Sequence, residues 1–144
     1  MRIILDTNII VSALISELGA PAQLLNAWTD RAFILVTSTT QIAEISSVTH
    51  RPVVRPLITP SHAERFINDL RRFGTALERL PTVERSRDPN DNFLLAMAEA
   101  SAAEYLVSGD KRDILALKRH GNTNIITANG MLPLLGITKV GGGG

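Results

Sequence analysis

The chain of 144 residues contains no cysteine, which excludes disulfide bonds, cysteine-ligated zinc, iron–sulfur clusters and thiol nucleophiles. Its three histidines, His50, His62 and His120, are scattered, so a histidine-rich zinc site is not expected. The longest unbroken apolar run, residues 93–98, is far shorter than the roughly 20 residues that a membrane-spanning helix needs. We therefore expect a soluble protein without a membrane segment.

The amino terminus has the basic start and apolar body of a signal peptide, but Asp6 and Asn8 interrupt that body. We therefore expect a cytoplasmic protein rather than an exported one. With 44% hydrophobic and 20% charged residues, the composition is that of one ordinary globular domain. Four of the ten glycines form residues 141–144, so we expect a domain over 1–140 followed by a flexible glycine tail or a cloning remnant.

Short apolar runs alternate with helical patterns along the chain, which is typical of an α/β fold with a central parallel sheet. The predicted strands and helices follow in chain order. Strands are expected over 2–5, 33–37, 76–80, 105–107 and 125–127, and helices over 8–15, 22–29, 39–49, 61–73, 89–102 and 111–119, with a helical turn at 131–135.

Two aspartates follow predicted strands closely. Asp6 comes directly after Leu5, and Asp110 follows the strand over 105–107 after Ser108 and Gly109. Ligands of open parallel sheets bind outside the carboxyl ends of the strands, so both carboxylates point to the same edge. The alternative is that each aspartate caps a helix; for Asp110 this is as good an explanation, because Asp110 and Asp113 have the spacing of a capping box.

Two further acids open or flank predicted helices. Asp88 before Pro89 is explained by N-capping, whereas Asp91 opens a helix that is apolar nearly all round and is expected to face a crevice. Glu44 lies on the border of the apolar face of its helix, where a solvated flank and a ligand are both possible.

The four acids Asp6, Glu44, Asp91 and Asp110 could meet at one edge of the sheet. Carboxylates that lie close together repel one another, so they must be partly protonated or neutralised by cations. Oxygen ligands select hard ions such as Mg²⁺ or Mn²⁺. Such a site suits a metal-dependent nuclease or phosphatase, in which the metal activates water.

The order of these motifs resembles that of the PIN-domain ribonucleases. The resemblance rests on an apolar strand followed by Asp6-Thr7-Asn8, on Glu44 in a mid-chain helix, on the sequence RDPNDN at 87–92 and on LVSGDKRD at 106–113. It covers residues 1–136 and is closest to VapC-type toxins of bacterial toxin–antitoxin pairs. Asn90, where the family often has another aspartate, and Ala128-Asn129, in place of a proline-containing stretch, are mild departures.

The resemblance implies a three-layer α/β/α domain with strand order 3-2-1-4-5. It implies an endoribonuclease that leaves a 5′-phosphate and uses one or two Mg²⁺ or Mn²⁺ ions, an RNA substrate, a small antitoxin partner and a homodimer. By position, Asp6, Glu44, Asp91 and Asp110 would bind metal, Asn8 would orient Asp6 or a bound water, Ser108 would lie beside the metals, and Asp113 would be an accessory acid. A structural role is equally open for Asp113, while Asn8 could begin a turn and Ser108 could fill a loop.

Three other classes of protein are alternatives to a nuclease. A haloacid-type phosphatase needs a second acid two residues after Asp6, where this chain has Asn8. A receiver domain carries its phosphoacceptor after the third strand rather than the first. An inert binding module would use the acids only as helix caps, which the retention of all four in order disfavours.

The net charge of +1 conceals an uneven distribution. As a whole-molecule average it argues against a general nucleic-acid binder. Residues 51–87, however, contain eight arginines, no lysine and four acids, a local charge of +4, and the rest of the chain carries −3. A solvated helix surface would explain this. The use of arginine without lysine also suits recognition of phosphate or carboxylate by the planar guanidinium group. We predict that this segment binds RNA backbone or an acidic antitoxin segment.

Overall fold

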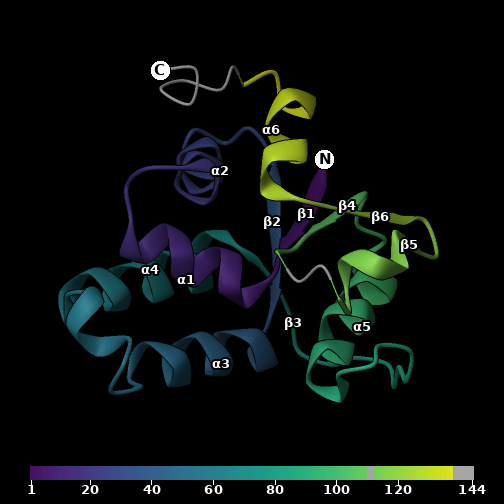
Figure 1. Ribbon diagram of the computed structural model, residues 1–144, viewed down its shortest axis with the longest axis horizontal. Helices are drawn as coiled ribbons and strands as arrows, with labels where there is room; N and C mark the ends of the chain where they lie inside the picture. Colours follow the sequence, from purple (N-terminus) through teal and green to yellow (C-terminus); the bar gives the residue numbers. More distant parts are fainter. Residues whose placement is uncertain (110–111, 138–144) are drawn as a thin grey trace.

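A six-stranded, mostly parallel sheet organises the computed structural model, which describes residues 1–109 and 112–137 (Figure 1). The spatial order is β3-β2-β1-β4-β6-β5. The strands are β1 (Arg2–Leu5), β2 (Ile34–Ser38), β3 (Thr75–Leu77), β4 (Tyr105–Val107), β5 (Arg119–His120) and β6 (Thr123–Ile126). In the centre of the sheet Ile4 pairs in register with Val36 of β2 and with Leu106 of β4.

The predicted strand order is correct for the parallel strands and incomplete at one edge. Counted without β5, the five parallel strands have the expected order, with β6 in fifth place. The sixth strand, β5, pairs antiparallel with β6 and was not predicted. Two residues are too few to show a strand pattern in the sequence.

Six helices and three 3₁₀ turns connect the strands. The helices are α1 (Thr7–Ile15), α2 (Ala20–Thr29), α3 (Thr39–Thr49), α4 (Pro60–Phe73), α5 (Asn92–Ser101) and α6 (Ala128–Leu134), and the turns are η1 (Arg55–Leu57), η2 (Pro89–Asp91) and η3 (Leu115–Leu117). Pro21 and Pro60 lie in the first turns of α2 and α4, where a missing backbone N–H costs nothing.

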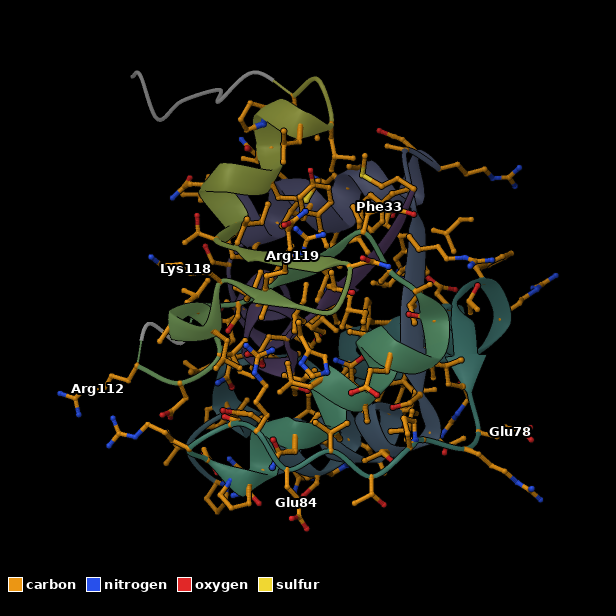
Figure 2. All side chains as sticks on the ribbon, turned by 90° about the vertical axis from the view of Figure 1, so that its right-hand side faces the viewer. Phe33, Glu78, Glu84, Arg112, Lys118 and Arg119 are labelled. Carbon is orange, nitrogen blue, oxygen red and sulfur yellow. The ribbon has the colours of Figure 1, made fainter. Side chains whose placement is uncertain are left out.

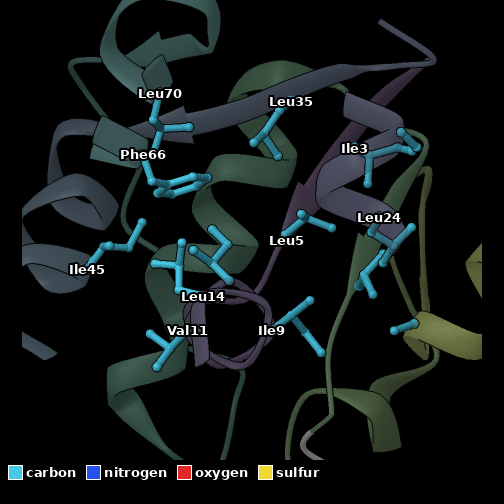
Figure 3. Packing of buried hydrophobic residues seen from close by; sticks show 14 of the residues in the cluster. Ile3, Leu5, Ile9, Val11, Leu14, Leu24, Leu35, Ile45, Phe66 and Leu70 are labelled. Atoms are coloured by element: carbon cyan, nitrogen blue, oxygen red, sulfur yellow. The ribbon is translucent and has the colours of Figure 1, made fainter. Parts of the chain in front are cut away.

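The helices cover both faces of the sheet, which makes three layers (Figure 1). On one face, Ile3 and Leu5 pack with α1, α2, α3, α4 and α6, and Figure 3 shows this cluster around Leu14, Leu35 and Phe66. On the other face, Ile4 packs against α5. The apolar character of α5 is explained by this position, because five consecutive residues of the helix, 94–98, are buried.

The helix predicted over 111–119 is wrong for the residues that the structure describes. Residues 112–114 form a turn, η3 follows, and the chain enters β5 at Arg119. Ile114 is fully buried beside α5, and the Ile125 N–H donates to the Lys118 carbonyl (2.9 Å). Gly121 does not end a helix; it forms the β5–β6 turn with a φ of +57°. Burial and strand pairing thus override the local helical pattern.

No single helix in the described part of the chain is long and apolar enough to cross a membrane. α1 and α2 pass that test only as a pair, and they are bent by 94° at the break between them. Both helices contribute buried side chains to the core, for example Ile10 and Leu24.

The connections bring the starts of α1, α3 and α5 to the carboxyl edge of the sheet. α1 follows β1 directly, and α3 follows β2 directly. α5 ends at the opposite edge, because the Ser101 carbonyl accepts a hydrogen bond from Arg2 Nη1 (3.1 Å) at the start of β1. A helix of ten residues is about 15 Å long, so α5 begins near the carboxyl ends of the strands.

Candidate active site

Asp6 lies at the carboxyl end of β1 and is the N-cap of α1. Its Oδ1 atom accepts a hydrogen bond from the Asn8 backbone N–H (3.2 Å), and its Oδ2 atom accepts one from the Ser108 hydroxyl (2.8 Å). Asp6 is only 5% exposed and Ser108 is fully buried. Helix capping explains the first contact, whereas the second comes from the end of the neighbouring strand and is not part of a cap. The fold therefore orients both oxygens of a buried carboxylate.

Glu44 lies in the second turn of α3 and is half-buried, as its border position on the helix predicts. Burial has the largest effect and raises the pKa of the Glu44 carboxyl group. In decreasing order, the buried Thr7 hydroxyl lowers the pKa, the Asp6 carboxylate raises it and the Arg51 guanidinium lowers it. Asp6 and Glu44 are therefore close enough for their charges to interact.

A second group of acids consists of Asp88, Asp91 and Asp113. One carboxylate oxygen of each lies within 4.8 Å of the others, close enough to hold a metal ion together, and all three residues are half-buried. Asp88 is the N-cap of the turn η2 and Asp91 is its last residue, and Asp113 lies after β4, next to the fully buried Ile114. Packing of Ile114 under α5 thus brings an acid from a distant part of the chain to the start of that helix.

Hydrogen bonds within residues 85–92, which we call the acid loop, fix its conformation. Asp88 Oδ1 accepts a hydrogen bond from the Asn90 N–H (3.0 Å), and the Asp91 N–H donates to the Asp88 carbonyl (3.0 Å). The Asn92 Oδ1 atom accepts from the backbone N–H groups of Arg85 (3.1 Å) and Ser86 (2.8 Å). Asp88 is therefore the helix cap that the sequence predicts, and it is also a member of the acid group, which the sequence analysis missed.

The predicted site residues divide into separate sets. Asp6, Ser108 and Glu44 are brought together, and Asp91 is brought to Asp113. Among the described residues, Asp6 and Glu44 do not belong to the group that lies within 4.8 Å. Asp110 lies outside the described residues.

Asn8 is placed next to Asp6, but its side chain is exposed. The hydrogen bond from Asn8 to Asp6 Oδ1 is donated by the backbone N–H of Asn8. The predicted role of Asn8 in orienting Asp6 or a bound water remains a prediction.

The donor set of Asp88, Asp91 and Asp113 fits a hard divalent cation. At the 4.8 Å limit, two fully ionised carboxylates repel by roughly 3 kcal/mol at an effective dielectric constant of about 20. A cation removes this repulsion, and carboxylate oxygens are the ligands that Mg²⁺ and Mn²⁺ prefer. This arrangement can gather positive charge at the carboxyl edge of the sheet.

Two hollows in the surface have other linings. One, of about 270 Å³, lies between α3 and α4 and is lined by His50, Arg55 and Arg71, among others. The second, of about 560 Å³, lies at the opposite edge of the sheet, beside Met1, where Ile34 begins β2. Neither contains an acid of the two groups, so the candidate site is not one of these hollows.

The sequence of the chain is similar to that of a known protein family. A family described as "PIN domain" matches residues 2–112, which is most of the chain and includes Asp6, Glu44, Asp88 and Asp91. No curated protein and no solved structure matches. The fold, with its largely parallel sheet between two helical layers, agrees with that match. The chain therefore belongs to the PIN-domain family.

Proposed function

We propose that this chain is an endoribonuclease that depends on Mg²⁺ or Mn²⁺ and leaves a 5′-phosphate on its product. PIN domains are metal-dependent nucleases, so the family match supports hydrolysis of phosphodiester bonds. The observation that carries the proposal is Asp6, a carboxylate that is 5% exposed and oriented through both oxygens beside Glu44. A buried carboxylate needs compensation by hydrogen bonds or by a cation.

The residues of the chain have separate tasks in this proposal. Asp6 and Glu44, with Ser108 supporting Asp6, and the group of Asp88, Asp91 and Asp113 would hold the cation. Asp110 completes the set by its position in the sequence. When bound, a divalent cation neutralises these carboxylates, polarises the phosphoryl oxygens and lowers the pKa of water for attack on phosphorus. No histidine base is needed.

Cleavage of a mixed RNA pool tests the activity. We expect wild type to cleave and Asp6→Asn to lose at least about 100-fold in rate, since a single preorganised electrostatic group contributes at this level. The control is Asp30→Asn, the same change at an exposed residue beyond the end of α2. Equal cleavage by wild type and Asp6→Asn, or cleavage that survives EDTA, would refute the assignment. Hydrolysis of phosphomonoesters without RNA cleavage would instead indicate a phosphatase. Binding of Mn²⁺ without any turnover would indicate a catalytically inert binding module.

The finer proposal is that this nuclease is the toxin of a toxin–antitoxin pair, cytoplasmic and homodimeric, with a small protein antitoxin. It is supported by the resemblance of the motifs at 6–8, 87–92 and 106–113 to VapC-type toxins. Induced expression should arrest bacterial growth, and Asp6→Asn should not. Light scattering of the purified chain tests the dimer. Growth arrest that is identical for both proteins would contradict the toxin role.

A further inference from the structure

A side-chain network on β5 reaches the acid loop from outside the part of the chain that matches the family. The family match ends at residue 112, whereas β5 and β6 lie at 119–126. Figure 2 views this side of the molecule, with Arg119 labelled in β5, Lys118 labelled just before it and Glu84 labelled in the segment that leads to the acid loop. The network joins these two parts of the chain through Arg85 and His120.

One nitrogen of Arg85 connects the acid loop to two groups of β5. Arg85 Nη1 donates to the Arg119 carbonyl (2.8 Å) and contacts His120 Nδ1 (2.7 Å). This nitrogen carries two N–H groups, one for each acceptor. Both contacts are within hydrogen-bond distance, although Arg85 itself is exposed.

The hydrogen-bond partners of His120 determine which tautomer its imidazole adopts. A guanidinium group only donates, so His120 Nδ1 must accept and the imidazole carries its proton on Nε2. That proton is donated to Glu99 Oε2 (2.6 Å) on α5. Only 11% of the His120 side chain is exposed, against 45% for Glu99. Glu99 thus orients the imidazole so that its lone pair faces Arg85.

The backbone of Arg85 is also held at the other end of the acid loop. The Asn92 side chain accepts from the backbone N–H groups of Arg85 and Ser86, which closes residues 85–92 into a ring. Asp88 and Asp91 lie within this ring. Arg85 therefore connects the segment that carries two of the clustered acids to the edge of the sheet.

We propose that Arg85 is a positioning residue for the metal site: with His120 as its acceptor, it ties the acid loop to β5 and keeps Asp88 and Asp91 beside Asp113. This inference rests on the cation site of the proposed function and adds β5 as its support.

Charge and position make opposite predictions for Arg85→Ala. If Arg85 acted only through its positive charge, its removal would strengthen the binding of a cation by the nearby acids. If it positions the loop, its removal weakens binding by roughly 10-fold, the lower end of the effect seen for supports of metal ligands. The direction of the change therefore distinguishes the two roles.

The experiment measures Mn²⁺ affinity of the full chain from the electron paramagnetic resonance signal of free Mn²⁺, together with hydrogen exchange of residues 86–92. Arg85→Ala and His120→Ala, which remove donor and acceptor separately, should both weaken Mn²⁺ binding and speed exchange. His120→Gln keeps one acceptor and one donor, so it should restore both the Mn²⁺ affinity and the slow hydrogen exchange. Arg79→Ala is the matched control, because Arg79 is an exposed arginine of the preceding segment.

Thermal unfolding first establishes that each variant is folded. If Arg85→Ala and His120→Ala bind Mn²⁺ as tightly as Arg79→Ala, or more tightly, the positioning role is overturned. Neither readout needs RNA cleavage, so this failure leaves the Asp6→Asn test of the nuclease untouched. Conversely, a chain that binds Mn²⁺ through the acid loop without cutting RNA would retain the positioning role and lose the proposed function.

Discussion

Replacing Ser108 by alanine removes a hydrogen bond between two buried residues. The Ser108 hydroxyl donates to Asp6 Oδ2 at 2.8 Å, Ser108 is fully buried, and Asp6 is 5% exposed. A hydrogen bond to a charged group contributes about 1.5–3 kcal/mol, so we expect a loss of about 2 kcal/mol in the free energy of unfolding. Ser108→Ala should also weaken Mn²⁺ binding by roughly 10-fold, because Asp6 loses its orientation.

Urea denaturation of wild type, Ser108→Ala, Asp6→Asn and the double variant measures the coupling between the two side chains. The control is Ser101→Ala, which also removes a buried hydroxyl, but one that donates to the neutral Met97 carbonyl (2.7 Å), and it should cost about 1 kcal/mol or less. A loss below about 0.5 kcal/mol for Ser108→Ala, the level of an ordinary surface change, would refute the reasoning. So would a coupling energy near zero.

Two further predictions concern Glu44 and the arginines. Folding raises the pKa of Glu44. At a pH between the ordinary pKa and the raised pKa, and with metal removed by EDTA, the folded chain therefore binds more protons than the unfolded chain. The free energy of unfolding then falls as the pH rises through that window. Glu44→Gln should remove this fall in urea titrations at several pH values; an unchanged pH profile would contradict it. All eight arginines of 51–87 are exposed, and we propose that those on α4 bind RNA phosphates. The double change Arg71→Ala and Arg72→Ala should therefore weaken the binding of uncleaved RNA. It should also make the slope of log affinity against log salt concentration less steep, by the contribution of about two phosphate contacts. Loss of antitoxin binding alone would assign this surface to the protein partner, and no change in either would end the proposal.

Much of the fold was predictable because its signals are local. The apolar strands, the prolines at the starts of α2 and α4, and the nearly all-apolar α5 each indicate an element from a few consecutive residues. Their alternation then gives the α/β class. The resemblance to the PIN-domain family, not the local pattern, gives the right order for the five parallel strands. The errors lie at residues 112–120, where Ile114 and Leu117 fit a helix pattern but are used for packing beside α5 and for the approach to β5.

The candidate site was predictable in part for the same reason. Asp6 follows its strand covalently, so the sequence places it at the carboxyl edge, and the structure adds the Ser108 contact. Asp88 was interpreted as a cap alone, and its capping bond to Asn90 is indeed present. Its proximity to Asp113 could not be inferred, because it depends on how the chain after β4 returns to α5.

The sequence by itself determined the PIN-type order of motifs, the α/β class and the edge of the sheet at which Asp6 lies, since adjacency along the chain settles each of them. Only the tertiary structure decided which acids meet and what holds them. The group of Asp88, Asp91 and Asp113 and the bond from Arg85 to His120 join segments that are far apart in sequence. Such contacts arise when packing of the core brings distant residues together, and no local pattern of residues encodes them.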